Sequence, residues 1–518
     1  MADLHPAHPP AGAGSHAPAP PGFGLRLATG LLGVLVAAMM AGFNNRVVAI
    51  GLPDLFGQLG WGQDDASWLG SAYSAGELAA MPFATWCAIT FSMRRFQLAM
   101  LAVVLLIALV LPTVHSLPLM LALRAVQGLC CGSQIPLLMM GALRFLPLSI
   151  RLHGLALYAM TATFAPNMSL ALAASWLDRL EDWRWLYWQA VPLSALAMVL
   201  IAWGIPVMPA MPQRLRQANW PGLLLGISGL TLLALGLDQG AQLDWFHARA
   251  IRLLLAGGAV LCCGFLISEW FHPAPFMKLQ LLARRNLALG FSLFLCLLVI
   301  MLSGASLPSM ALGHVQGFRT LQMEDIGLAI GLPQLLLGPM VAMLLYQCRV
   351  DARHVFVLGL LCMAAACWEG SGLTAAWMGH DFHLAQLLQA IGQPMAVVSL
   401  LFLATSVVQP MEGAYVSGII NTLRAFGTLA GSAMVGRLLT LRTDFHHEML
   451  QDQASWQASH AAIPLAELAA QLNAQASTLA IADVYRVLGL FALLLIPAVL
   501  MMQYIPAPVL PSRPSNHG

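Results

Sequence analysis

The sequence predicts an all-α polytopic membrane protein with fourteen transmembrane helices. Hydrophobic residues make up 59% of the 518 residues and charged residues only 9%, and the mean hydropathy is +0.77. Water-soluble domains carry about 25% charged residues, so this composition indicates a chain that lies mostly in lipid. Apolar runs of about 20 residues, the length that crosses a bilayer as a helix, recur along almost the whole chain.

The apolar runs fall into a group of six, a central pair and a second group of six. Their expected ranges are 26–50, 67–90, 96–113, 118–143, 153–176, 186–208, 220–238, 250–271, 286–313, 325–347, 354–377, 383–408, 413–440 and 480–504. This order predicts two six-helix bundles joined by two additional helices. The expected domains are an N-terminal bundle at 25–208, the added pair at 209–272 and a C-terminal bundle at 273–505 with an outer loop at 442–479.

Loop charges predict how the helices are oriented. Cytoplasmic loops of membrane proteins are enriched in Lys and Arg. Basic residues collect in alternate loops, at Arg94, Arg95, Arg144, Arg151, Arg214, Arg216, Lys278, Arg284, Arg285, Arg349 and Arg353. Of the loops on that side, only the one near Gln409–Gly413 lacks a basic residue. Both termini are therefore expected in the cytoplasm, with residues 1–24 and 506–518 as tails, the first disordered because it is rich in Pro, Ala, Gly and His.

Several classes of protein are excluded by composition. A formal net charge of +2 without a basic patch argues against a nucleic-acid partner. Lys278 is the single lysine and no glycine precedes it, so the chain has no Walker A loop for ATP. The nine cysteines form no CxxC pair, and Gln451 stands where a zinc-protease signature after His446 and His447 would need another histidine. We expect no metal and no cofactor, and no constellation of catalytic groups points to an enzyme.

One charged residue lies inside an apolar run. Arg124 shares a helical face with Gln127, Cys131 and Gln134, at spacings of three, seven and ten residues. A charge at bilayer depth costs at least about 2.5–3.5 kcal/mol, so this face is expected to meet a partner or a water-filled cavity. Snorkelling of Arg124 to the interface is the alternative. The run containing Arg124, Gln127 and Gly128 is echoed by the run containing Gln389 and Gln393, which suggests an internal duplication unless the similarity arose by chance.

The motif RAVQG at 124–128 resembles the R-x-x-Q-G motif of the major facilitator superfamily, and the chain as a whole is similar to its fourteen-helix drug:proton antiporters of the EmrB/QacA type. The resemblance also covers GLPDL (51–55), SWLGSAYSAGELAAMP (67–82), WRWLYWQAVP (183–192) and NTLRAFGTLAG (421–431). It implies the major facilitator fold and export of amphipathic small molecules or drugs across a bacterial inner membrane by proton antiport. Its expected partners are the substrate, protons, the lipid bilayer and a periplasmic adaptor protein docked on 442–479, for which a solvated acidic loop is the alternative.

The proton-carrying acid is the main departure from the family. Its members usually carry an aspartate in the first helix, where this chain has Asn44. Glu77, in the middle of the second helix, is therefore the first candidate for proton coupling, and Glu369 is the second. The alternative for Glu77 is a structural ion pair with Arg124 or Arg46. Glu77 and Glu369 are expected to be the interior acids of the protein.

Other residues are expected to act through their position in the fold. The candidates for lining the substrate cavity are Asn44, Tyr73, Gln134, Asn167, Gln389 and Gln393. The resemblance makes Arg424 a packing or gating residue and the loop with Arg94 and Arg95 a gating loop. Because Arg46, Arg124 and Arg424 outnumber the expected interior acids, neutral or anionic amphipathic substrates are favoured over cations. Alternatives to drug export are proton-linked transport of a metabolite such as an organic acid and, from another class, a polytopic membrane enzyme or scaffold.

Overall fold

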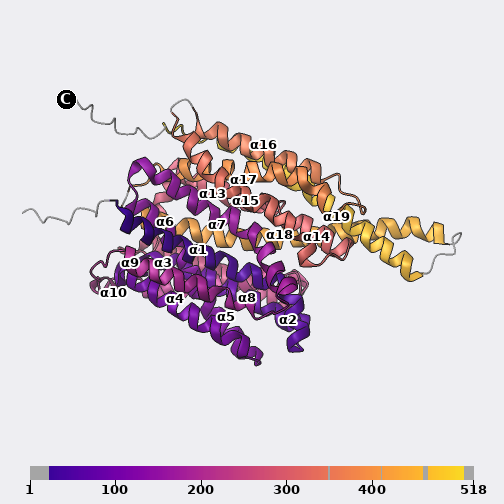
Figure 1. Cartoon of the computed structure of the whole chain (residues 1–518), viewed down its shortest axis with the longest axis horizontal. Coiled ribbons are helices and arrows are strands. Elements are labelled where there is room, and N and C mark those ends of the chain that lie inside the picture. Colours follow the sequence, from indigo (N-terminus) through magenta and orange to yellow (C-terminus); the bar gives the residue numbers. More distant parts are fainter. Residues whose placement is uncertain (1–22, 348–349, 410, 459–464, 507–518) are drawn as a thin grey trace, which may run out of the picture.

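A computed structural model describes residues 23–347, 350–409, 411–458 and 465–506, and within these ranges every regular element is a helix (Figure 1). The first half contains α1 (Leu25–Ile50), α2 (Leu52–Leu59), α3 (Gln63–Phe91), α4 (Met93–Val110), α5 (Leu117–Gly132), α6 (Gln134–Phe145), α7 (Leu148–Ala174), α8 (Trp185–Trp188) and α9 (Ala190–Gly204). The connecting region contains α10 (Gln213–Arg216), α11 (Trp220–Asp238) and α12 (Arg249–Phe271).

The second half contains α13 (Arg285–Met301), α14 (Ser306–Val315), α15 (Glu324–Leu345), α16 (Ala352–Gly370), α17 (His383–Thr405), α18 (Gly413–Ala458) and α19 (Leu465–Leu500). Short 3-10 or π turns lie at Leu111–Thr113, Ser175–Arg179, Trp245–His247, Leu279–Ala283, Thr320–Met323 and Gly379–Phe382. The all-α membrane fold predicted from the sequence is confirmed.

Twelve helices in the described part of the chain are long and apolar enough to span a membrane. The two remaining predicted spans coincide with α3 and α18, which are 29 and 46 residues long but less apolar than the others. Both lie inside the assembly, where they pack against each other and against helices of both halves. The count of fourteen spans stays a prediction.

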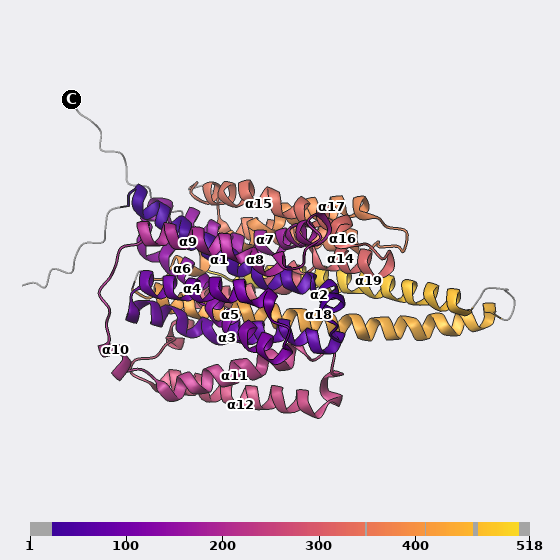
Figure 2. The same cartoon turned by 60° about the horizontal axis from the view of Figure 1, so that its bottom comes forward.

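Within the segment predicted as an outer loop at 442–479, the described residues 442–458 and 465–479 are helical. α18 continues to Ala458 and α19 begins at Leu465, so the two helices form a long hairpin that projects beyond the bundle (Figure 2). The sequence contains no Gly or Pro between Gly436 and Pro464 that would end a helix. The hairpin is tied at its base, because the Asp483 carboxylate accepts hydrogen bonds at 2.7 Å from Arg442 Nε and from His446 Nε2. The prediction of a loop was wrong because polarity marks the end of an apolar run, whereas helix propensity continues past it.

Several pairs of helices join the halves. α7 packs on α15 and α17, and α18 packs on α3 and α6, while α11 covers α3 and contacts α18 from the outside. α11 and α12 form a separate layer beside α3 in Figure 2. The first described residues of α1 and the segment after α19 lie at one end of the bundle, here termed the terminal end, and the hairpin projects from the opposite, far end (Figure 1).

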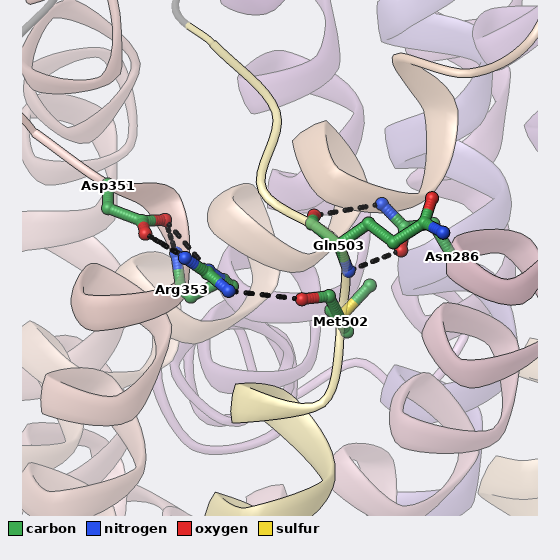
Figure 3. Close-up of polar contacts among 5 residues, drawn as sticks. All are labelled: Asn286, Asp351, Arg353, Met502 and Gln503. Carbon is green, nitrogen blue, oxygen red and sulfur yellow. Dashed lines mark hydrogen bonds and ion pairs between the residues drawn. The ribbon is translucent and has the colours of Figure 1, made fainter.

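The segment after α19 is fastened to the second half at the terminal end (Figure 3). Asn286 Nδ2 donates to the carbonyl oxygen of Gln503 at 3.1 Å, and the Gln503 amide donates to Asn286 Oδ1 at 2.7 Å. Arg353, which is paired with Asp351 at 2.7 Å, donates to the carbonyl oxygen of Met502 at 3.2 Å. These bonds join the starts of α13 and α16 to the end of α19.

The loop near Gln409–Gly413, which has no basic residue of its own, lies next to a basic residue from another loop. Arg284, from the neighbouring loop at the terminal end, donates to both oxygens of the Glu412 carboxylate at 2.7 Å. The hydrogen bonds from this guanidinium lower the pKa of Glu412 from its ordinary value. A cation therefore lies beside this loop even though its own sequence supplies none.

Candidate functional site

A cavity of about 220 Å³, here termed the central cavity, lies between the two halves. Its walls come from α1, α3 and α18, and the end of α11 closes one side. The polar residues of the lining are Asn45, Arg46, Ser74, Glu77, Asp238, Arg424, Thr428 and Ser432. Four ionisable side chains therefore share a small cavity at the middle of the bundle.

A second cavity of about 240 Å³, here termed the vestibule, continues from the first. Asn45, Ser74 and Asp238 line both cavities. The vestibule is also lined by Leu52, the first residue of α2, by Ser67 near the start of α3, and by Gln239 and Gln242, which follow α11. The polar path thus runs from the middle of the bundle toward the far end.

The terminal side of the central cavity is closed by contacts between the halves. The Ser417 hydroxyl on α18 donates to the Pro136 carbonyl oxygen at 2.6 Å, and the Tyr158 hydroxyl donates to Asn421 Oδ1 at 3.0 Å. Closer to the terminal end, the Leu152 amide donates to the Tyr346 hydroxyl at 3.1 Å. The structure therefore represents a state that is closed toward the chain termini.

Glu77 lies on the wall of the central cavity. Within the described ranges, no side-chain nitrogen of Arg, Lys or His lies within 4.0 Å of its carboxylate, so the predicted alternative of an ion pair with Arg124 or Arg46 is not formed. Arg46 and Arg424 line the same cavity. A carboxyl group in this position can exchange a proton with cavity water. Its negative charge interacts electrostatically with Arg46 and Arg424, although it forms no ion pair with either.

Arg424 connects the halves across the cavity wall. Its guanidinium donates to the hydroxyl of Thr161 on α7 and, at 3.2 Å, to the carbonyl oxygen of the same residue. The side chain is 7% exposed. The expected packing or gating role is compatible with this contact, because separation of α7 and α18 would break it.

Arg124 is held in a cage of neutral groups. The residue is fully buried, so it does not snorkel to the interface. It donates to Gln127 Oε1 at 2.9 Å and to Asn45 Oδ1 at 3.2 Å, and its guanidinium carbon lies 4.4 Å from the centre of the Tyr73 ring. The cage needs close packing of α3 on α5, since a Cβ atom at Gly128 would lie 2.1 Å from the Tyr73 carbonyl oxygen.

Two of the predicted cavity residues are packed inside the first half. The Asn44 amide nitrogen donates to the Cys131 sulfur at 3.7 Å, and Gln134 Nε2 donates to the Cys130 carbonyl oxygen at 3.3 Å. Both residues are buried and lie outside the linings of the central cavity and the vestibule. Tyr73 is also outside these linings and serves the Arg124 cage.

The remaining predicted cavity residues form a chain of hydrogen bonds across the interface of the halves. Asn167 Nδ2 on α7 donates to Gln393 Oε1 at 3.3 Å. Gln393 Nε2 donates to Gln389 Oε1 at 3.2 Å, and Gln389 Nε2 donates to the Ser303 hydroxyl at 2.7 Å. This network is next to the close α7–α15 contact, where a Cβ atom at Gly327 would lie 2.2 Å from the Asn167 carbonyl oxygen. Their role in substrate binding remains a prediction.

Three predicted residues lie away from the central cavity. Glu369 is next to the last residue of α16 and does not contribute to the lining. Arg94 and Arg95 belong to the first turn of α4, since the predicted gating loop is reduced to Ser92, whose φ of 77° makes the sharp turn. The Ser92 hydroxyl accepts a hydrogen bond from the Met208 amide at 3.2 Å, which fastens this turn to the segment after α9.

The expectation that Glu77 and Glu369 are the interior acids was incomplete, because Asp238 and Glu269 also lie inside the protein. Asp238 lines both cavities, and Glu269 is fully buried and accepts a hydrogen bond from Asn219 at 2.8 Å. The sequence did not single out Asp238 because it is the last residue of α11, where an acidic residue at the membrane–water interface is common. Its position against α3 is set by tertiary packing, which one sequence does not show.

The arrangement of two helical halves around a polar cavity is typical of a membrane transporter that opens alternately to each side. The chain matches the Major Facilitator Superfamily over residues 34–432, and it belongs to that superfamily. It is a multi-pass membrane transporter and not an enzyme.

Individual proteins similar to this chain include transporters with named functions. The chain is 24% identical to the multidrug export protein EmrB of Haemophilus influenzae, covering 81% of this chain and 82% of that protein. It is 23% identical to the fatty acid resistance protein FarB of Neisseria gonorrhoeae, covering 83% of this chain and 84% of that protein. A crystal structure of the peptide transporter POT aligns with a TM-score of 0.57 at 15% identity, covering 93% of this chain and 98% of that one, which shows the shared fold.

The Arg124 cage generates a direct test. Replacing Arg124 with Lys should lower the transport rate by about 30-fold, because an ammonium cannot donate to Gln127 and Asn45 in one plane and a hydrogen bond from a charged group is worth about 2 kcal/mol. Uptake into proteoliposomes measures the rate, and Arg249→Lys, on the exposed start of α12, is the matched control. Normal transport by Arg124→Lys would show that the position requires only a positive charge.

Proposed function

We propose that this protein exports amphipathic small molecules across a bacterial inner membrane by proton antiport. The observation that carries the proposal is Glu77, an acid without a direct ion-pair partner among the described residues, on the wall of a cavity between the two halves. One carboxyl group is sufficient to couple two fluxes if it is protonated in one state of the transport cycle and ionised in the state that binds the substrate. The proteins named as multidrug exporters among the relatives support the direction of transport.

The loop charges assign the terminal end to the cytoplasm, by the tendency of basic residues to stay inside. The vestibule then opens toward the periplasm, and the described state is closed toward the cytoplasm. In this state a substrate leaves and a proton enters. The reverse state would require separation of the contacts that Ser417 and Tyr346 make across the halves.

The charge of the cavity favours anionic amphipathic substrates. Arg46 and Arg424 face Glu77 and Asp238, which gives no net charge when both acids are ionised. Arg46 and Arg424 can bind the headgroup of an anionic amphiphile while both acids are ionised. A cation finds no excess negative charge in the cavity in either protonation state. The name of the relative FarB, a fatty acid resistance protein, supports the same class.

The helical hairpin of α18 and α19 is proposed as the docking surface of a periplasmic adaptor. It projects beyond the far end of the bundle, which the loop charges assign to the periplasm (Figure 2). Its base is fixed by the contacts of Asp483 with Arg442 and His446, and Arg486 adds a third bond at 3.0 Å. A rigid base under a projecting pair of helices is suited to hold a partner in one orientation.

The role of Glu77 predicts the behaviour of Glu77→Gln. This variant should lose the dependence of transport on a pH gradient, because Gln has nearly the same shape and cannot release a proton. Proteoliposomes with an imposed gradient measure the effect, with radiolabelled taurocholate, a permanently anionic amphiphile, as the probe. Glu369→Gln, an acid outside the central cavity, is the matched control and should transport normally. Gradient-driven transport by Glu77→Gln at the normal rate would contradict the proposal.

The charge preference predicts an order among competitors. Decanesulfonate should inhibit taurocholate transport more strongly than decyltrimethylammonium, because the two share a tail and differ in the sign of the headgroup. Both are added below their micelle-forming concentrations, and an uncharged decyl glycoside reports the effect of the tail alone. Stronger inhibition by the cation, abolished in Glu77→Gln, would overturn the preference.

Adaptor docking predicts a difference between cells and liposomes. Replacing residues 450–475 with a short Gly-Ser linker should leave transport in proteoliposomes intact, because the contacts of Asp483 lie outside the deleted segment. Drug resistance of cells that depends on an adaptor should be lost. Unchanged resistance in the same cells would dismiss the docking surface.

A further inference from the structure

Asp238 stands where the vestibule and the central cavity meet. It belongs to α11, one of the two helices added between the halves, and it lines both cavities together with Asn45 and Ser74. The vestibule extends from it to the far end, and the central cavity extends from it to Glu77. Each volume, about 220 and 240 Å³, exceeds many times the roughly 10–15 Å³ that one water molecule requires.

Hydrogen bonds set the orientation of the Asp238 carboxylate. Gln239 Nε2 donates to the Ser71 hydroxyl oxygen at 2.6 Å, so the hydroxyl hydrogen of Ser71 is directed to Asp238 Oδ2. Gln239 also donates to the Ser67 hydroxyl at 3.3 Å, at the side of the vestibule. One carboxylate oxygen is thus fixed against α3, which leaves the other oxygen for water in the cavities.

The charged groups around Asp238 do not neutralise it directly. Arg46 on α1, Glu77 on α3 and Arg424 on α18 share the central cavity with it, but no nitrogen of a basic side chain in the described ranges lies within 4.0 Å of its carboxylate. On α12, which packs beside α11, Arg249 and Arg252 are exposed. The carboxylate is therefore free to change its charge without breaking an ion pair.

We propose that Asp238 is the entry carboxylate for the coupled proton, so that an added helix and not a helix of either half supplies the first step of coupling. This inference rests on the proposed proton antiport. A hydronium ion in the vestibule gives a proton to the free oxygen of Asp238: one of its O–H bonds breaks, an O–H bond forms on Asp238, and a water molecule is left. The same proton then passes through water in the central cavity to a Glu77 oxygen, and Asp238 regains its negative charge. Glu77 releases the proton on the opposite side after the halves have rearranged.

A purely structural role for Asp238 predicts a different pattern of variants. As a tie between α11 and α3, Asp238 would act only as an acceptor for the Ser71 hydroxyl. The amide oxygen of Asn can accept the same bond, so Asp238→Asn would be tolerated and Ser71→Ala would be harmful. As the entry carboxylate, Asp238 must titrate, so the order is reversed.

The experiment compares gradient-driven transport with exchange of taurocholate at equal pH on both sides, which needs no net proton movement. Asp238→Asn should slow gradient-driven transport by about 100-fold, the size of a lost proton-transfer group, while exchange persists and changes only as far as the loss of one negative charge alters taurocholate binding. Ser71→Ala should keep both activities near those of the unaltered protein, and Asp238→Glu should restore part of the gradient-driven rate.

Two outcomes overturn the inference. One is normal gradient-driven transport by Asp238→Asn, and the other is a loss of both activities in Asp238→Asn and Ser71→Ala alike. The Glu77→Gln variant separates this failure from that of the proposed function. If Glu77→Gln loses the gradient dependence while Asp238→Asn keeps it, only the inference about Asp238 fails. If Glu77→Gln keeps it as well, the proton antiport itself fails.

Discussion

The cost of placing charge inside a membrane protein constrains the whole structure. An unpaired ion transferred from water to a low-dielectric interior costs several kcal/mol even after relaxation. The protein meets this cost in two ways. Arg124 is surrounded by neutral acceptors and aromatic faces that replace its hydration, and it holds α3 and α5 in fixed contact. Arg46, Glu77 and Asp238 instead face cavities large enough for water. The cage around Arg124 makes the packing of α3 and α5 rigid, whereas the acids that face the cavities can gain or lose a proton.

This division separates the rigid framework from the proposed coupling residue within one helix, α3. On α3, Tyr73 lies against Arg124, while Glu77, one turn further along, faces the central cavity. A Cβ atom at Gly132 on α5 would lie 2.4 Å from the Glu77 carbonyl oxygen, so the backbone that carries the acid is packed as closely as the arginine cage. Proton binding at Glu77 can therefore change the charge of the cavity while its backbone stays in place. The response is expected at the interface of the halves, where Arg424 bonds Thr161.

Some helices could be predicted from the sequence almost to their ends because a bilayer sets the length of an apolar run. The range 220–238 is an example, and the structure has α11 at Trp220–Asp238. The interior position of Arg124 followed from the same reasoning about charge. The sequence also made Asn167 and Gln393 candidates for the cavity lining, but one sequence cannot tell whether a polar side chain meets water or another polar side chain, and here the two meet each other. Asp238 was missed because its surroundings come from α1, α3 and α18, far away in the sequence.

The central claim is the proposal that Glu77 exchanges a proton when a substrate binds at the central cavity. Proton release from the purified protein on addition of decanesulfonate or decyltrimethylammonium, in weakly buffered detergent solution with a pH indicator, tests it without a membrane. The account predicts that the pH change on binding is present in the unaltered protein and in Glu369→Gln and absent in Glu77→Gln, although all three bind the ligand. An equal pH change in Glu77→Gln would contradict the account, because the proton would then come from another group.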